Sequence, residues 1–337
     1  MLRRVLALFM AGRFASSRSS QGKQASKLLQ IFATIGTTNK FYAEFGFNAN
    51  SLEGGSGANS YALWNRGWQG LFLDGSHGNA SINLHKTFIK STTIVATFDK
   101  FSVPKELDYL SVDIDSADLW VLKSILSTYR PRVITIEYNS NYGYHPGTIT
   151  FPDPQVMPIL HGKDTWEPPS CYMGASASAI MSLVAKEHGY KLVDVEPALD
   201  LFFVRGDVAK GSTIETLDPR VEVLPIQQWH GKLSTQEAEN LIDYQTYMRT
   251  HSVCQARQSA ARYLIGLAHM YQKWSPVSGK HPQKRSPYYC FSGLLNLRIQ
   301  NCSTTEAEQV VPSNRIGVCQ NTHCMKKRKN KGKLTAH

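Results

Sequence analysis

Five apolar runs alternate with helical patterns along residues 41–138, and each run carries or is followed by a carboxylate. A short apolar run bounded by turn residues predicts a buried strand, whereas apolar residues spaced three and four apart predict a helix. Strands that alternate with helices predict a mostly parallel sheet with helices on both faces, as in a Rossmann-like, doubly wound α/β fold. We expect the five strands at residues 41–47, 70–74, 93–98, 107–115 and 132–138.

The segment after these runs predicts how the sheet ends. Residues 176–188 have helical spacing and stop at Gly189, which is a common residue just after a helix. The runs at 190–195 and 199–204 are joined by a short Glu-Pro-Ala turn. Two runs joined in this way predict a C-terminal hairpin, which adds an antiparallel strand at one edge of the sheet. We therefore expect the Rossmann-like domain at residues 25–210.

Carboxylates gather at or near the expected carboxyl ends of the strands. In a doubly wound sheet these ends meet at one edge, where ligands bind. The strand interiors are apolar, so solubility alone does not explain acids at five successive strand ends. Some of them could instead cap the following helices, a role worth about 1 kcal/mol each, and Asp115 fits that role best. The acids are Glu44, Asp74, Asp99, Asp113, Asp115 and Glu137.

The stretch between the first two strands has the order of a nucleotide site: strand, glycine-containing turn, helix, strand and acid. Glycine lets the backbone approach a ligand, and an acid such as Asp74 at the end of the second strand binds the ribose hydroxyls. The turn after the first strand holds only Gly46, so the full dinucleotide fingerprint G-x-G-x-x-G is absent. The alternative is a flexible surface loop at residues 54–57 beside a solvated Asp74.

The net charge of +11 is concentrated at the two ends of the chain. Residues 1–43 hold seven Lys or Arg and no acid, and residues 249–337 hold fifteen Lys or Arg and two acids. The central residues 44–248 therefore carry a net charge of −9. Because phosphate binding needs clustered Lys and Arg, we expect no nucleic-acid binding by this core.

The segments outside the core predict targeting, an accessory unit and a tail. Residues 1–24 are rich in Arg and Ser, which is typical of a mitochondrial transit peptide, while a secretory signal or an untargeted, cytoplasmic basic arm stays open. Residues 211–273 predict an accessory helical segment, with an S-x-x-E capping box at Ser234 and Glu237. Residues 274–337 lack periodicity and predict a basic, disordered tail. No apolar run is long enough for a transmembrane helix.

Five of the six cysteines follow residue 250, and only Cys171 lies in the core. Their spacings do not match the paired cysteines of zinc sites, and a metal at Cys319, His323 and Cys324 is a weak alternative. We expect a core without disulfides and no metal site. The oligomeric state has no signal in the sequence.

The order of these motifs resembles the FkbM-type class I methyltransferases, which use S-adenosylmethionine, and is nearest to a divergent eukaryotic branch of that family. The first motif of the family has an acid, a glycine and an asparagine at alternate positions, here Glu44, Gly46 and Asn48. Its fourth-strand signature, Asp-x-Glu-Gly-x-Glu, reads Asp-Ile-Asp-Ser-Ala-Asp at residues 113–118. Asp74, Glu137 and the closing Asp-Leu-Phe-Phe-Val at residues 200–204 also match. The resemblance covers roughly residues 40–206.

The resemblance implies S-adenosylmethionine-dependent methylation, on an oxygen of a small molecule, glycan or lipid. The cofactor contacts that it implies are Glu44, Gly46, Asn48, Asp74 for the ribose and Asp99 for the adenine edge. The residues that it places toward the acceptor are Asp113, Asp115, Glu137 and Asn139, beneath a lid of residues 141–166 in which His145 and His161 are alternative bases. Aspartate replaces both signature glutamates and Ser116 replaces the glycine. These departures keep open a non-catalytic Rossmann-like binding domain with a vestigial nucleotide site, and an NAD-dependent dehydrogenase is a weaker alternative.

Overall fold

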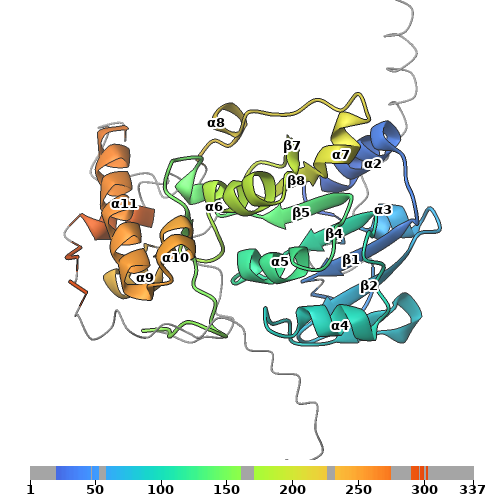
Figure 1. The fold of residues 1–337 in the computed structure, drawn as a ribbon, viewed down its shortest axis with the longest axis horizontal. Coiled ribbons are helices and arrows are strands. Elements are labelled where there is room, and N and C mark those ends of the chain that lie inside the picture. The colour runs from blue at the N-terminus through green and yellow to red at the C-terminus, as the bar shows by residue number, and fades with distance from the viewer. Residues whose placement is uncertain are drawn as a thin grey trace, which may run out of the picture.

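A seven-stranded mixed sheet forms the centre of the molecule in the computed structural model (Figure 1). The structure describes residues 20–46, 48–52, 58–160, 171–225, 232–274, 290–295, 297–299 and 301–302. The strand order is β3-β2-β1-β4-β5-β8-β7. The strands are β1 Phe41–Phe45, β2 Gln69–Asp74, β3 Leu84–Lys86, β4 Tyr109–Val112, β5 Val133–Glu137, β7 Lys191–Val195 and β8 Asp200–Val204. The fold is the expected Rossmann-like α/β class.

The first five strands are parallel, and the predicted hairpin is present as β7 and β8. The antiparallel strand is not at the edge, however, because β8 pairs with β5 on one side and with β7 on the other. Its first residue, Asp200, pairs with the last residue of β5, Glu137. The start of β8 therefore lies at the same edge of the sheet as the carboxyl ends of the parallel strands.

Helices cover both faces of the sheet, as expected for alternating strands and helices. One face packs against α4 Ile94–Lys100, α5 Asp118–Leu126, α6 Ala177–Met181 and the π-helical turn Ser182–Glu187. The other face packs against α2 Gln24–Ile35, α3 Tyr61–Trp64 and α7 Gly206–Lys210. This layering buries the apolar strands on both sides, which is what their near-continuous hydrophobicity requires.

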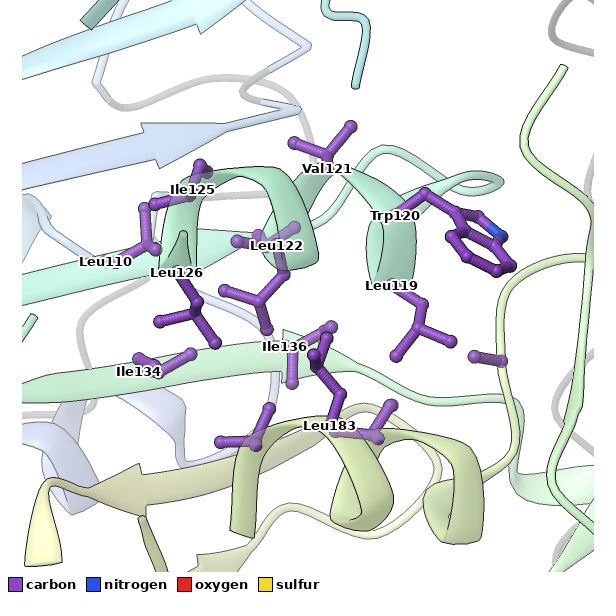
Figure 2. Packing of buried hydrophobic residues seen from close by; sticks show 14 of the residues in the cluster. Leu110, Leu119, Trp120, Val121, Leu122, Ile125, Leu126, Ile134, Ile136 and Leu183 are labelled. Carbon is purple, nitrogen blue, oxygen red and sulfur yellow. The ribbon is translucent and has the colours of Figure 1, made fainter. Parts of the chain in front are cut away.

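Helix α5 shows how the spacing of apolar residues builds the core (Figure 2). Leu119, Leu122 and Leu126 recur at intervals of three and four, so they lie on one face of the helix. This face packs on Ile134 and Ile136 of β5. Each side chain is at most 6% exposed, and burying one stabilises the fold by roughly 1.5–3 kcal/mol. The packing holds the start of α5 against the carboxyl end of β4.

One predicted strand is wrong. The run at residues 93–98 belongs to helix α4, and the third strand is instead β3, which lies outside the runs that we expected to be strands. The residues of α4 favour a strand by their β-branching, but Ile94 and Phe98 are four apart and both are buried against the core. The burial of one helical face overrides the local preference.

A second unit packs beside the sheet, to the left in Figure 1. It contains α9 Thr235–Asn240, α10 Tyr244–Thr250, α11 Val253–Trp274 and a two-stranded antiparallel sheet of β6 Ile149–Thr150 and β9 Ile242–Asp243. The predicted capping box at Ser234 and Glu237 is present at the start of α9. Because β6 comes from the long segment after β5, this unit is continuous with the Rossmann-like domain. The short helix α8 Pro219–Glu222 lies between the two.

Part of the tail that we expected to be disordered packs on this second unit. Cys290, Phe291, Leu294 and Leu297 are buried in the same cluster as the apolar face of α11. A disulfide between Cys254 and Cys302, which the spacing of the cysteines did not predict, joins the tail to the start of α11. Cys171 and Cys290 are buried and lie outside this disulfide.

Several predicted features lie outside the described residues. These are the arm at residues 1–19, the loop at 161–170 with His161 and Trp166, and the tail from residue 303 with Cys319, His323 and Cys324. Across the part of the chain that the structure does describe, none of the helices combines the length and the apolar character needed to cross a membrane.

Candidate functional site

A pocket of about 420 Å³ lies at the carboxyl edge of the sheet, where the strand order reverses between β1 and β4. In open α/β sheets this switch point is where ligands bind. Residues that follow β1, β2, β4 and β5 line it, together with the start of β8 and with segments 88–91 and 153–155. Of the nine residues predicted for the site, six line the pocket: Gly46, Asn48, Asp74, Asp113, Asp115 and Glu137.

The turn after β1 brings the backbone close to the end of β4. Gly46 has φ +69°, and a Cβ at this position would collide with the carbonyl oxygen of Asp113. Asn48 also has positive φ, and its backbone N–H donates to Asp74 Oδ2 at 2.8 Å. The single glycine of the motif is therefore required by its conformation and by the close approach of two strand ends.

Asp74 lines the pocket, but donors from the chain itself already occupy most of its carboxylate. Oδ1 accepts hydrogen bonds from the backbone N–H groups of Ser76 and His77 and contacts His77 Nδ1 at 2.9 Å. Among the described residues, Oδ2 accepts a hydrogen bond only from Asn48. Burial raises the pKa of Asp74, but these hydrogen bonds outweigh it, so that the pKa lies below its ordinary value. Asp74 can therefore accept one further hydroxyl, on Oδ2, rather than the two that we expected.

Glu44 does not line the pocket, contrary to the prediction of a cofactor contact. Its carboxylate is 4% exposed and accepts the backbone N–H groups of Asn59, at 2.7 Å, and Ser60, at 2.8 Å. Burial raises the pKa of Glu44 to about 7, even though both hydrogen bonds oppose the change. Glu44 thus holds the start of α3 against the sheet, because its side chain points to the opposite face of β1 from Ala43 and Phe45.

The end of β4 carries three aspartates with different roles. Asp118 Oδ1 accepts the N–H of Ile114, and Oδ2 accepts the N–H of Ser116, so Asp118 holds the turn before α5. We expected Asp115 to do this, but Asp115 has φ +61° and lines the pocket. Burial, with Asp115 nearby, raises the pKa of Asp118 to about 6.

Asp113, Asp115 and Glu137 bring their carboxylates together in the pocket. One oxygen from each lies within 4.8 Å of the others. Burial raises the pKa of Asp113 and of Glu137 well above its ordinary value, and the neighbouring carboxylates raise both further. A raised pKa makes a carboxylate a stronger base in its ionised form, and the three together offer oxygen ligands to a cation.

Two pocket acids, Asp153 and Asp200, were not predicted as site residues. Asp200 Oδ2 accepts from Gln24 Nε2 at 2.6 Å and from Asn59 Nδ2 at 3.2 Å, and burial raises its pKa to about 7. Asp153 accepts from the Ser91 hydroxyl at 2.6 Å. A signal for Asp200 was available, because an acid that starts an antiparallel strand lies at the edge where the parallel strands end.

The N-terminal segment forms part of the pocket, although we assigned residues 1–24 to a targeting arm. Gln21 and Gln24 line the pocket beside Asp200. The backbone N–H of Lys23 donates to Glu196, and Lys27 forms an ion pair with Asp194 at 2.6 Å. These contacts attach the segment to the β7–β8 hairpin, so the folded unit begins at or before residue 20.

Asn139 and Asp99, both predicted for the site, lie outside the pocket. The Asn139 amide donates to the carbonyls of Cys171 and Met173, and its oxygen accepts from Asn141, so it fixes the long loop after β5. Asp99 is on α4, exposed, and paired with Lys105 at 2.6 Å. The error at Asp99 follows from the error in the third strand.

The expected lid contributes to the pocket only through residues 153–155. Tyr142 is buried in the second unit, and Tyr144 and His145 line a different, more open cavity of about 610 Å³. Burial lowers the pKa of His145, which leaves it neutral at pH 7, but it is not positioned to act as a base in the first pocket. This part of the prediction is wrong for the described residues.

The residues that line the first pocket are mostly acidic among the charged ones. Six of its lining residues are acids, and Lys90 is the only Lys or Arg among the described residues that line it. An acidic, partly dehydrated pocket favours a ligand that carries positive charge.

Comparisons with models of known protein families and with curated proteins find no match for this chain. A function can therefore be proposed only from the chain's own residues.

Proposed function

We propose that this chain is an S-adenosylmethionine-dependent methyltransferase that acts on an oxygen of a small molecule, glycan or lipid. The observation that carries the proposal is the acidic pocket at the switch point, which the Gly46 turn and Asp74 both line. S-adenosylmethionine has a ribose and bears positive charge on its sulfonium and its amine. Both features match a pocket that has one free acceptor position on Asp74 and, among the described residues, a single lysine.

The loop after β3 replaces Asp99 as the candidate for the adenine end of the ligand. Phe88 lines the pocket with its ring 56% exposed, and Lys90 Nζ lies 5.8 Å from the centre of that ring. An exposed aromatic ring at a pocket wall offers a face on which a planar base can stack. Asp74 is at the end of the neighbouring strand, so a ribose beside it and a base near Phe88 fit one continuous ligand.

The chemistry requires positioning and a base. In methyl transfer the acceptor oxygen forms a bond to the methyl carbon while the carbon–sulfur bond breaks, and its electron pair stays on the sulfur. Holding the two reactants in line is the main contribution open to the protein. The hydroxyl proton must also leave. Asp113 and Glu137 are our candidates to accept it, because a raised pKa makes the ionised carboxylate a stronger base.

Calorimetry with S-adenosylhomocysteine, the demethylated product, tests the proposal directly. We expect saturable one-to-one binding to the full chain, and Asp99→Ala should leave the affinity unchanged because Asp99 lies outside the pocket. Absence of both binding heat and thermal shift at millimolar ligand would overturn the proposal.

A non-catalytic binding domain is the second candidate. Two observations favour it. Glu44 points away from the pocket, and backbone donors already occupy most of the Asp74 carboxylate, so fewer contacts are left for a cofactor. The two candidates differ in turnover. Release of S-adenosylhomocysteine from S-adenosylmethionine in the presence of a broad set of hydroxylated metabolites supports the enzyme, whereas binding without release against that set supports the binding domain.

A further inference from the structure

The second cavity, of about 610 Å³, lies where the second unit packs against the Rossmann-like domain (Figure 1). Helix α6 and the π-helical turn after it line one side, and α8, α10 and the loop at residues 144–148 contribute the rest of the described lining. Among the described residues, none lines both this cavity and the first pocket. Cavities of this size commonly bind small molecules, and they occur preferentially where two units meet.

The charged residues that line the second cavity are basic. Over the described part of the chain, Lys186 and Arg220 line it, and no Asp or Glu does. The first pocket has the opposite composition, with six acids and one lysine. A concave site lined by one sign of charge attracts ligands of the other sign. The second cavity therefore favours an anion.

Three donors in this cavity are available to a ligand. Within the described residues, the exposed ammonium group of Lys186 has neither an ion pair nor a hydrogen bond, and the Tyr144 hydroxyl has no hydrogen bond. Arg220 differs, because Asp218 accepts from its Nε and Nη2, the latter at 2.6 Å. That pairing leaves Nη1 and offsets the charge of the guanidinium, so Lys186 supplies most of the attraction for an anion.

Hydroxyl and amide groups make up most of the remaining polar lining, and contacts within the fold hold them in place. Ser178 donates to the backbone carbonyl of His145. The Gln245 amide donates to the Ser182 hydroxyl at 2.7 Å, and Thr148 Oγ1 accepts the backbone N–H of Gln245 at 3.0 Å. A few fixed polar groups of this kind determine the orientation of a small ligand. Because hydroxyls and amides both donate and accept, they suit a ligand that has several hydroxyls.

The backbone of this wall is also unusual. Helix α6 passes directly into the π-helical turn, and π-helical geometry is rare and frequent at functional sites. The turn contributes Ser182, Ala185 and Lys186 to the cavity, together with Ser178 and Met181 of α6. The irregular segment therefore carries the one lysine of the cavity.

From these observations we infer that the second cavity binds an anionic sugar, whose phosphate, sulfate or carboxylate group contacts Lys186 and Arg220. An ammonium group and a guanidinium N–H both form charge-assisted hydrogen bonds to such oxyanions. The hydroxyls of the sugar meet the hydroxyl and amide groups of the lining. This site does not rest on the proposed methyl transfer, which uses the first pocket.

Calorimetry of the full chain with glucose 6-phosphate, glucose 6-sulfate and glucuronate tests the site and identifies the anionic group. We expect saturable one-to-one binding of at least one of them, and neutral glucose should bind at least about tenfold more weakly. Lys186→Gln combined with Arg220→Gln should weaken the binding at least about tenfold. The control, Lys191→Gln with Lys210→Gln, removes the same charge at exposed positions outside the cavity and should change binding less than about twofold.

Circular dichroism establishes that the cavity variant is folded, as expected for two exposed side chains. If it does not fold, Lys186→Gln alone carries the test, with Lys191→Gln as its control. Absence of saturable binding of all three sugars to the wild type, or equal losses in the cavity variant and the control, overturns the inference. Calorimetry with S-adenosylhomocysteine tests the proposed function separately, so either idea can fail while the other stands.

Discussion

Buried carboxylates at the two edges of the sheet have different surroundings. At the amino edge, Asp108 is fully buried, and Arg132 donates to it at 2.7 Å. The backbone N–H groups of Thr38 and Lys40 donate to it as well. At the carboxyl edge, Asp113, Glu137 and Asp200 line one pocket, and burial raises the pKa of each of them.

The pKa directions report this difference. Burial acts to raise the pKa of Asp108, but Arg132 and the N–H donors outweigh it, and the net pKa is lowered. Burial and like charges raise the pKa of Asp113 and Glu137. At the amino edge the chain therefore stabilises a buried carboxylate with a cation and with backbone donors. At the carboxyl edge it places several buried acids side by side in a pocket.

The largest expected effect comes from removing the buried ion pair between Arg132 and Asp108 at the amino edge. Arg132→Ala should lower the free energy of unfolding by about 3–5 kcal/mol, because it leaves Asp108 charged and buried without its partner. Urea unfolding followed by circular dichroism measures this. Lys105→Ala is the matched control, since it removes the exposed pair with Asp99 and should cost under about 1 kcal/mol. Equal effects of the two substitutions would contradict the contrast between buried and exposed pairs.

The second prediction concerns pH and Glu44. Its pKa is about 7 in the folded protein against 4.5 for the free side chain, so the folded state holds an extra proton between these values. Stability from this group is complete below pH 4.5 and falls as pH rises through 7, by roughly 3 kcal/mol in total.

Urea unfolding at several pH values measures that slope. In Glu44→Gln, which cannot titrate, stability should fall less steeply with pH, by about 1.4 kcal/mol per pH unit in this range. Identical slopes in wild type and Glu44→Gln would be inconsistent with a buried, protonated Glu44.

The third prediction concerns the cofactor at the carboxyl edge. Asp74→Ala should weaken S-adenosylhomocysteine binding by about tenfold to a hundredfold, because one charge-assisted hydrogen bond, worth about 1.5–3 kcal/mol, is lost. Asp99→Ala, measured in the same calorimeter, should bind like the wild type. Wild-type affinity in Asp74→Ala would show that the ligand does not reach Oδ2.

The smallest expected effect is a gain in stability. Asp113→Asn removes a carboxyl group whose ionised form burial and the neighbouring acids disfavour, so in EDTA it should raise the free energy of unfolding by about 1 kcal/mol at pH 8. The same variant should lose turnover if Asp113 serves the reaction. A decrease in stability, seen in urea unfolding, would mean that Asp113 has a stabilising partner within the fold.

Much of the fold could be predicted because it depends on periodicity. Four of the five expected strands and the hairpin are present, since apolar runs between turn residues leave few other ways to bury their surface. The exception, residues 93–98, has β-branched residues that suit a strand and an i, i+4 pair that suits a helix. Whether the segment forms a strand or a helix depends on how it packs against the rest of the core, which the segment's own sequence does not reveal.

The site was predicted in outline but not in its bonds. Placement at strand ends located Gly46, Asp74, Asp113 and Glu137 at one edge. It did not show that Glu44 faces away, because side chains alternate along a strand and the register was unknown. It also missed Asp200, whose position depends on β8 inserting beside β5.

The sequence by itself determined that strands and helices alternate, that acids follow the strands and that the core is acidic between basic ends. Those properties are local, and the periods of helix and strand reveal them. Only the tertiary structure decided which donors reach each acid and which acids line the pocket. The donors that decide this, such as Asn59 for Glu44 and Gln24 for Asp200, are 15 and 176 residues away along the chain. Folding alone brings them within hydrogen-bond distance.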